Sequence, residues 1–447
     1  MDHTEHFPST ESNKDYLWIH DLSSEGRGVA RRDDGRIVMV WGAIPGDTIR
    51  YEVEKEPAKG PVSGKLIEVV NPSPQRVAHP CPHYERGCPA SLLGAIRREF
   101  SLSWKHEHLV ETFRRIGGLE GLNVEDVIPS PRQWRYRDRL EFQLFRTNGY
   151  IQMGYSHQDN FIPIQDCRIG SEHIREPFIK LRQSLSMLDQ YPHIGDRVPL
   201  RLMLRHNGNS KVVAVLFAVT RGKVDVKPLR EWLNQADLAG WEIRKVKDAK
   251  ARFADSVIED TEGDSFIYHL VAGRQLKADP IVFSQSNTKA ALLMVDEVLE
   301  QLPPKGKLLD LYGGFGFFGF EYAERGGKAT VYDSSELAIQ AGLRFAKESK
   351  LPVDLEVMNL NSSAVKKIPM NKYDAIILDP PHSGADDNML SMLNENGTER
   401  IVYVSCHGAA LARDLKKLTN YNPELVIPID MFPSTSELEA IAVLDKK

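Results

Sequence analysis

Cysteine is scarce in this chain, and no apolar run is long enough to cross a membrane. Four cysteines among 447 residues are too few for a disulfide framework, so we expect a reducing, cytoplasmic location. The acidic opening MDHTEHFPSTESNKDY lacks the basic segment and apolar core of a secretory signal. Positive charge is not in excess either, because 57 lysines and arginines face 62 aspartates and glutamates, a net charge of −5. This balance excludes a uniformly basic surface for binding nucleic acid, but it does not exclude a local basic surface.

The composition is ordinary for folded domains, with 41% apolar and 27% charged residues, and the length suits about two to four of them. We expect residues 1–15 to form a flexible tail. Residues 16–72 consist of short β-type runs with turns at Asp33-Asp34-Gly35 and Pro45-Gly46-Asp47. This pattern predicts a small OB-like barrel of about five antiparallel strands.

A mixed central domain with a cysteine-containing loop is predicted over residues 73–272. Its expected helices and strands are Leu92–Ile116, Glu176–Leu188, Arg139–Arg146 and Val212–Val219. Pro177 suits the first turn of the second helix, where its missing N–H costs nothing.

Strands alternate with helices from residue 273 to residue 447, which predicts an α/β, Rossmann-like, doubly wound and mostly parallel sheet. Such sheets bind ligands at the carboxyl ends of their strands. The first of these strands lies in LLDLYGGFG (308–316), where Asp310 precedes a glycine-rich turn that lets the backbone approach a ligand. The next strand ends at Asp333, where a carboxylate can bind ribose hydroxyls. The spacing is not G-x-G-x-x-G, and an ordinary strand-to-helix turn is the alternative.

Three further chemically active residues lie at the ends of apolar strands. Asp379 ends AIILDPP, in which two prolines fix the loop. Cys406 follows VYVS and precedes a helix, whose N-terminus lowers the pKa of a nearby thiol. Glu439 lies between a loop and a last apolar strand. Each residue also has a purely structural interpretation, as a solvated carboxylate or as a small buried side chain.

Five motifs in this order resemble the RNA uracil-C5 methyltransferase family, and the resemblance extends over most of the chain. They are FSQSN (283–287), DLYGGFG, LDPPHSG, SCHGAALARDL and DMFPSTSELE. The family patterns are F-x-Q-x-N, D-L-F-C-G-x-G, DPPR-x-G, SCNP-x-x-LARD and DMFPHTxHVE. In addition, GRGVARRDDGRIVMVWGAIPGD resembles a TRAM domain, an RNA-binding module, and WRYRDRLEFQL is similar to a YRNK-type segment of the family's central domain.

The resemblance implies a role for each matching residue. Cys406 corresponds to the nucleophile and Glu439 to the general base. The positions that contact S-adenosylmethionine or the target base correspond to Gln285, Tyr312, Asp333, Asn359 and Asp379. A thiolate that adds to carbon 6 of uracil makes carbon 5 nucleophilic towards the methyl group. A base then removes the carbon 5 proton, so that the thiolate can leave.

The chain differs from the family pattern near these residues. His407-Gly408 stands in place of Asn-Pro, and His382 stands in place of the arginine that follows the two prolines. The other differences are Ser434 and Glu437 in place of histidines, and Phe317 in place of an asparagine.

Relatives with a TRAM domain often carry a 4Fe–4S cluster on four cysteines. The cysteines available here are Cys81, Cys88 and Cys167, and Ser91 stands where a further thiolate would be. Three interpretations stay open: a cluster with one non-cysteine ligand, a loop without metal, or a zinc-like site completed by His79 or His83.

A basic strip with nearby tryptophans lies in the predicted barrel and suits phosphate contacts and base stacking on single-stranded RNA. It consists of Arg27, Arg31, Arg32 and Arg36, with Trp18 and Trp41. We therefore expect a monomeric, S-adenosylmethionine-dependent enzyme that makes 5-methyluridine in structured RNA. The combination of TRAM domain and cysteines favours large-subunit ribosomal RNA over transfer RNA. An RNA-binding relative without catalysis and a small-molecule methyltransferase are the alternatives.

Overall fold

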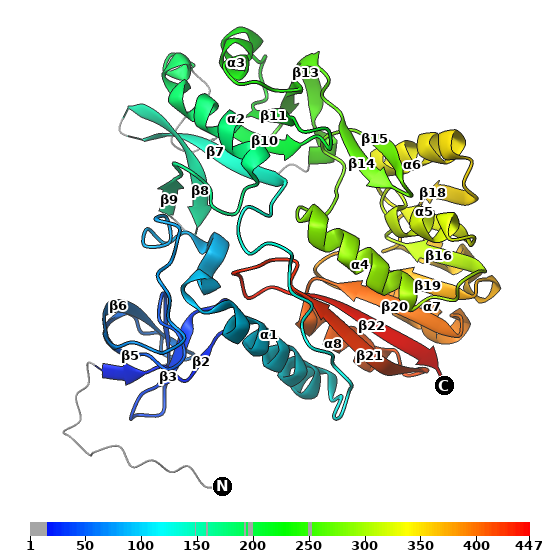
Figure 1. The fold of residues 1–447 in the computed structure, drawn as a ribbon, viewed down its shortest axis with the longest axis horizontal. Helices are drawn as coiled ribbons and strands as arrows, with labels where there is room; N and C mark the ends of the chain where they lie inside the picture. The colour runs from blue at the N-terminus through cyan, green and yellow to red at the C-terminus, as the bar shows by residue number, and fades with distance from the viewer. Residues whose placement is uncertain (1–15, 148, 158–159, 192–193, 195–199, 249–252) are drawn as a thin grey trace. The chain divides into compact units, whose positions relative to one another are not determined.

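The computed structural model (Figure 1) describes residues 16–147, 149–157, 160–191, 194, 200–248 and 253–447. The tail predicted at residues 1–15 lies outside these ranges. The chain forms two compact units, Met1–Ser101 with Ser434–Ser436, and Leu102–Pro433 with Glu437–Lys447. Among the helices in the described ranges, none has the length and apolar composition needed to cross a membrane.

The first unit contains a six-stranded sheet in the order β1-β5-β6-β4-β3-β2. Its strands are β1 (Tyr16–Trp18), β2 (Asp21–Leu22), β3 (Gly28–Arg31), β4 (Ile37–Val40), β5 (Thr48–Lys55) and β6 (Val62–Asn71). Neighbouring strands are antiparallel except β4 and β6. Strand β2 has two residues, too few to produce an alternating pattern, which is why the sequence predicts about five strands. The apolar side chains of the alternating runs form a buried core.

Asp47 closes the turn predicted at Pro45-Gly46-Asp47. Its buried carboxylate accepts hydrogen bonds from the backbone N–H groups of Ile44 and Ser73, both at 2.9 Å, and pairs with the guanidinium of Arg76. A buried carboxylate costs free energy unless it is paired in this way. The turn is therefore fixed by one side chain.

The helix expected over residues 92–116 is divided into three parts. They are the 3-10 helix η1 (Pro89–Ala95), α1 (Arg98–Thr112) and the π-helical turn η2 (Phe113–Gly117). The first break lies at Ile96, whose extended backbone forms a β-bridge with Arg76. Apolar spacing alone does not reveal such a long-range bridge.

Seven strands form a mixed sheet in the central part of the second unit, in the order β13-β12-β11-β10-β7-β8-β9. They are β7 (Arg139–Thr147), β8 (Tyr150–His157), β9 (Asn160–Pro163), β10 (Leu200–His206), β11 (Val212–Val219), β12 (Gly240–Val246) and β13 (Val257–Gly263). Strands β11 and β12 are parallel, and the other neighbours are antiparallel. Both strands predicted in this region are confirmed, as β7 and β11.

Helix α2 (Glu172–Gln183) follows the edge strand β9 in the chain, and α3 (Val226–Leu233) connects β11 to β12. Strand β14 (Ile267–Val271) pairs with β15 (Arg274–Ala278) in a separate hairpin. Because α2 begins at Glu172, Pro177 lies inside the helix, and its placement in the first turn was wrong. The helix starts after Ser171, a small polar residue of the type that favours helix N-termini, which the prediction overlooked. Short 3-10 turns are η3 (Leu185–Leu188), η4 (Phe253–Asp255), η5 (Ser363–Lys367) and η6 (Met370–Lys372).

The C-terminal sheet confirms the doubly wound prediction. Its order is β18-β17-β16-β19-β20-β22-β21. The strands are β16 (Lys307–Leu311), β17 (Lys328–Asp333), β18 (Val353–Val357), β19 (Ala375–Leu378), β20 (Arg400–Ser405), β21 (Tyr421–Ile429) and β22 (Glu439–Lys446). The first five are parallel, and β22 is antiparallel to both β20 and β21. The helices are α4 (Thr288–Glu300), α5 (Phe317–Glu324), α6 (Glu336–Ser349), α7 (Asp387–Asn396) and α8 (Gly408–Lys417).

Both faces of this sheet are buried. Alternate residues of β19 belong to different apolar clusters, Ile377 to a cluster that includes residues of α4, α5 and α6, and Ile376 to one that includes residues of α7 and α8. Burial on two faces explains why these strands are near-continuous apolar runs. It also leaves the strand ends as the places where polar residues collect.

Candidate active site at the carboxyl edge of the parallel sheet

The parallel strands end level with one another. Leu311 of β16 pairs with Tyr332 of β17 and with Leu378 of β19. The residues at the strand ends are therefore neighbours along one edge of the sheet, and they include Tyr312, Asp333 and Asp379. The sequence prediction that these residues share an edge is confirmed.

Cys406 and Glu439 reach the same edge from adjacent strands. In the antiparallel pairing of β20 with β22, Ser405 lies opposite Ala440. Cys406 follows Ser405 directly, and Glu439 is the first residue of β22, so the two backbones end side by side. Cys406 is half-buried, whereas Glu439 is 1% exposed and its Oε2 has no hydrogen-bond partner among the described residues. A buried carboxylate oxygen left in this state is typical of a functional site.

The glycine-rich turn after β16 is built around two aspartates. Asp310 is fully buried, and its Oδ2 accepts the backbone N–H of Gly319 at 3.1 Å. A Cβ atom at Gly313 would lie 2.6 Å from the Asp310 carboxyl, so only glycine fits there. Asp333 accepts the N–H groups of Gly314 at 3.0 Å and Ser335 at 2.7 Å. The two carboxylates thus hold the turn in shape.

Tyr312 and Asn359 are linked through Asn361. Tyr312 has a positive φ of 62° and donates its hydroxyl to Oδ1 of Asn361 at 3.0 Å. The side chain of Asn359 accepts the backbone N–H of Asn361 at 3.1 Å. A left-handed backbone is costly for tyrosine, and such outliers concentrate at functional sites.

The FSQSN segment is held by a buried arginine. Arg205 of β10 is 3% exposed and donates to the backbone carbonyls of Pro280 and Val282 at 2.7 and 2.6 Å. It also donates to the hydroxyl of Ser284 at 2.5 Å. This clamp fixes the backbone immediately before Gln285, which is half-buried. The buried arginine that holds this candidate residue has no signature in the sequence.

The loop after Asp379 is fastened to α8 by Asp414. This buried carboxylate accepts the hydroxyl of Tyr403 at 2.7 Å and the N–H of Ala385 at 2.8 Å. Gly384 has a φ of +86°, and a Cβ there would lie 2.4 Å from both Arg413 and Asp414. This role of Asp414 was not predicted from the sequence, although its position in the LARD motif was an available signal.

Two of the residues that depart from the family pattern meet beside Cys406. The rings of His382 and His407 stack at 4.1 Å between centroids with an interplanar angle of 14°. The loop after Asp379 and the start of α8 are therefore in contact, even though the proline of the family pattern is missing.

Burial raises the pKa of four carboxyl groups in this cluster, and nearby negative charges add to the effect in three of them. The pKa values of Asp310 and Asp379 rise to about 7, first through burial and then through nearby aspartates. The pKa of Glu439 also rises, through burial and the charges of Asp379 and Glu437, and that of Asp333 rises through burial. Such a cluster is stabilised by a cationic ligand, because a positive charge favours all the ionised forms at once.

The thiol of Cys406 does not have the lowered pKa predicted from its position before a helix, and that prediction was wrong. Burial, followed by the charges of Glu439 and Asp379, raises its pKa to about 12. Helix α8 does begin close by, at Gly408, but the field of a helix terminus is weaker than burial beside carboxylates. In the free protein the thiol is therefore protonated at neutral pH.

The candidate metal ligands are divided between the two units. In the first unit, the Cys81 thiol lies 3.3 Å from Nδ1 of His83, and His79 contacts the carbonyl of Ser91 at 2.9 Å. Within each unit, the described residues contain no group of three or more His, Cys, Asp or Glu side chains arranged to hold a metal ion. With Cys406 in the other site, only three cysteines remain, which does not fit a four-thiolate cluster.

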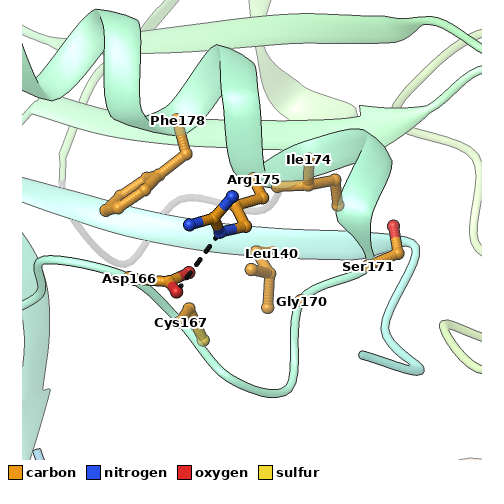
Figure 2. Close-up of a pocket in the computed structure, with 8 residues that line it drawn as sticks. All are labelled: Leu140, Asp166, Cys167, Gly170, Ser171, Ile174, Arg175 and Phe178. Atoms are coloured by element: carbon orange, nitrogen blue, oxygen red, sulfur yellow. Dashed lines mark hydrogen bonds and ion pairs between the residues drawn. The ribbon is translucent and has the colours of Figure 1, made fainter. Parts of the chain in front are cut away.

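Cys167 belongs to the second unit and borders a shallow hollow of about 160 Å³ (Figure 2). Asp166 and Arg175 form an ion pair at 3.3 Å across its lining. The hydroxyl of Tyr155 lies 3.5 Å from the Cys167 sulfur. A hollow this small does not accommodate a nucleoside, since ligand pockets usually measure about 300 Å³ or more.

The basic strip of the first unit is partly neutralised. Arg32 and Arg36 contact Glu56 at 3.2 and 2.7 Å, and Arg27 contacts Glu25 at 3.3 Å. Trp18 is 61% exposed, so one aromatic face is available for stacking. An RNA-binding role for this surface stays a prediction.

Comparisons with known proteins identify the family. Residues 99–447 match the family model described as tRNA (Uracil-5-)-methyltransferase. The chain belongs to this family. It is thus an RNA uracil-C5 methyltransferase of the S-adenosylmethionine-dependent type, which confirms the resemblance seen in the motifs.

Full-length relatives include proteins named for ribosomal RNA and for transfer RNA. The chain is 27% identical over 438 residues to the 23S rRNA (uracil(1939)-C(5))-methyltransferase RlmD of Dichelobacter nodosus, covering 96% of this chain and 98% of the relative. It is 28% identical over 429 residues to the tRNA (uracil(54)-C(5))-methyltransferase of Pyrococcus horikoshii, covering 95% and 98%. The solved Pyrococcus abyssi tRNA (uracil-54, C5)-methyltransferase, in complex with S-adenosyl-L-homocysteine, shares the fold with a TM-score of 0.75 at 24% identity, covering 96% and 100%.

The raised pKa of Cys406 predicts slow alkylation of the free protein. Because only the thiolate reacts, the rate with iodoacetamide should rise about tenfold per pH unit from pH 7 to pH 9 without a plateau. Mass spectrometry of the peptide containing Cys406 measures this rate, and the buried Cys81, Cys88 and Cys167 serve as internal references. A plateau below pH 8 would contradict the assignment of the raised pKa.

Proposed function

We propose that this enzyme makes 5-methyluridine in structured RNA, through a covalent bond between Cys406 and carbon 6 of the target uracil. The observation that carries the proposal is the meeting of Cys406 and Glu439 at one end of the paired strands β20 and β22. A nucleophile and a general base on adjacent strands can act on neighbouring ring atoms of one uracil.

The chemistry divides between these two residues. The Cys406 sulfur adds to carbon 6, which converts the ring to an enolate and makes carbon 5 nucleophilic. S-adenosylmethionine, when bound, supplies an electrophilic methyl group on a cationic sulfonium. Glu439 then takes the proton from carbon 5, the double bond between carbons 5 and 6 forms again, and the thiolate leaves. Oε2 of Glu439, which has no hydrogen-bond partner among the described residues, is the natural proton acceptor.

The cofactor site is proposed at the glycine-rich turn and the aspartates around it. The candidate contacts are Gln285, Tyr312, Asp333, Asn359 and Asp379. Support comes from the shared edge of Tyr312, Asp333 and Asp379, from the raised pKa values of Asp333 and Asp379, and from Oδ1 of Asp310, which has no hydrogen-bond partner among the described residues. A sulfonium cation offsets the repulsion between these carboxylates.

For the RNA substrate we propose large-subunit ribosomal RNA first and transfer RNA second. The N-terminal region does not distinguish a ribosomal RNA enzyme from a transfer RNA enzyme. The transfer RNA enzyme of Pyrococcus horikoshii also matches 95% of this chain. The relative named for 23S rRNA matches 96%. We therefore expect RNA with an accessible uridine, whose extrusion from a stack costs about a few kcal/mol.

Mapping 5-methyluridine in cells with and without the gene tests the substrate. We expect one ribosomal RNA uridine to lose its methyl group in the deletion strain, and restoration by the wild-type gene. Loss of the methyl group in transfer RNA alone would favour the second candidate. An unchanged 5-methyluridine content in both RNA classes would refute the proposed function.

Replacing the nucleophile gives the first mutational prediction. Cys406→Ala should reduce methyl transfer from labelled S-adenosylmethionine by at least about 10³-fold and form no covalent RNA adduct, because carbon 5 is not activated. Cys167→Ala is the matched control, since that cysteine lies between β9 and α2 and outside the C-terminal sheet, and it should retain activity. An active C406A variant would remove Cys406 from the mechanism.

Replacing the proposed general base, Glu439, should separate methyl transfer from removal of the carbon 5 proton. Glu439→Gln keeps the size of the side chain but cannot accept the proton, so we expect methylated RNA to stay attached to Cys406. The adduct should survive a denaturing gel, and turnover should fall by about 10²–10⁴-fold. Glu424→Gln, which changes an exposed glutamate of β21, is the control. Free methylated RNA released by E439Q at the wild-type rate would show that another group is the base.

A further inference from the structure

The segment between β21 and β22, which leads to Glu439, is held by side chains from distant parts of the chain. Lys105 of α1 donates from Nζ to Oδ1 of Asp430 at 2.6 Å. The same nitrogen donates to the backbone carbonyls of Phe432 at 3.2 Å and Glu437 at 2.8 Å. One ammonium group therefore contacts both the beginning and the end of this segment.

Other side chains hold the positions between these contacts. Nδ2 of Asn287 donates to the carbonyl of Met431 at 2.9 Å. The hydroxyl of Tyr136 donates to the carbonyl of Pro433 at 3.4 Å. Backbone carbonyls that accept side-chain donors in this way are fixed without regular secondary structure.

Lys105 is buried to a degree that is unusual for lysine. Its side chain is 1% exposed, and that of Asp430 is 4% exposed. A buried ion pair of this kind adds little net stability compared with apolar residues of similar size, because both charges lose their hydration. A specific geometry is therefore the better explanation for it than stability.

We propose that Lys105 is a positioning residue for Glu439, which it holds in place for removal of the carbon 5 proton. This inference rests on the proposed function. The carbonyl of Glu437 that accepts from Lys105 lies two residues before Glu439, so a shift there moves the carboxylate. The ammonium acts through the backbone, since the raised pKa of Glu439 has its causes in burial, Asp379 and Glu437.

The proton-removal step is distinct from methyl transfer and can be followed separately. The bond from carbon 5 to hydrogen breaks, its electron pair forms the double bond to carbon 6, and the bond from carbon 6 to the Cys406 sulfur breaks. Glu439 receives the proton. RNA containing 5-tritiated uridine reports this step as tritium released into water, while labelled S-adenosylmethionine reports the methyl transfer.

The test uses the double variant Lys105→Met with Asp430→Asn, which removes both charges and leaves no unpaired buried ion. In single-turnover reactions we expect methyl transfer within about twofold of wild type and tritium release slower by about 10- to 100-fold, since small displacements of a base have effects of this size. The covalent adduct should persist on denaturing gels. Tritium release at the wild-type rate, or an equal loss in both steps, would overturn the proposal.

Two further variants keep the outcome interpretable. Lys105→Arg retains the charge but changes the directions of its donors, so it should fold and slow tritium release selectively even where the double variant is unstable. Lys211→Met removes an exposed lysine that pairs with Asp237 at 3.0 Å, and it should leave both steps unchanged. A wild-type enzyme that transfers no methyl group to RNA would instead refute the proposed function, which separates the two failures.

Discussion

The antiparallel pairing of β20 with β22 is the constraint on which the rest of the site depends. A purely parallel sheet would leave the amino end of its last strand at the opposite edge. Because β22 is antiparallel to β20, its first residue, Glu439, lies beside Cys406. Tyr312, Asp333 and Asp379 lie at the same edge, at the carboxyl ends of the parallel strands. The proposed nucleophile and general base thus share an edge with three candidate cofactor residues because of the strand topology.

The second constraint is electrostatic. Asp310, Asp379 and Glu439 all have raised pKa values, and the thiol of Cys406 is shifted in the same direction by the same surroundings. Each new negative charge at this edge therefore makes the next one more costly. On the proposed function, the sulfonium of the cofactor relieves this repulsion, so that formation of the thiolate is coupled to an occupied site. An empty site then holds a thiol that is protonated at neutral pH.

Much of this arrangement could be predicted from the sequence, because it is carried by local signals. Strand–helix alternation predicts the sheet, and the motifs around Asp310, Asp379 and Cys406 mark its carboxyl edge. The pKa of Cys406 could not be predicted, since it depends on Glu439 and Asp379, which only the folded sheet brings close. The break at Ile96 was missed for the same reason, because its cause is a bridge to Arg76 from another part of the chain.

Residues that hold the site in place have the weakest sequence signals of all. Arg205 and Lys105 are charged residues on a strand and a helix, and such residues are normally solvated. Their function is seen only where the fold buries them against backbone carbonyls of segments far away in the chain. Both fix irregular segments that carry candidate site residues, which regular hydrogen bonding cannot do. The precision that catalysis needs is thus supplied by long-range polar contacts, while the sheet supplies the approximate placement.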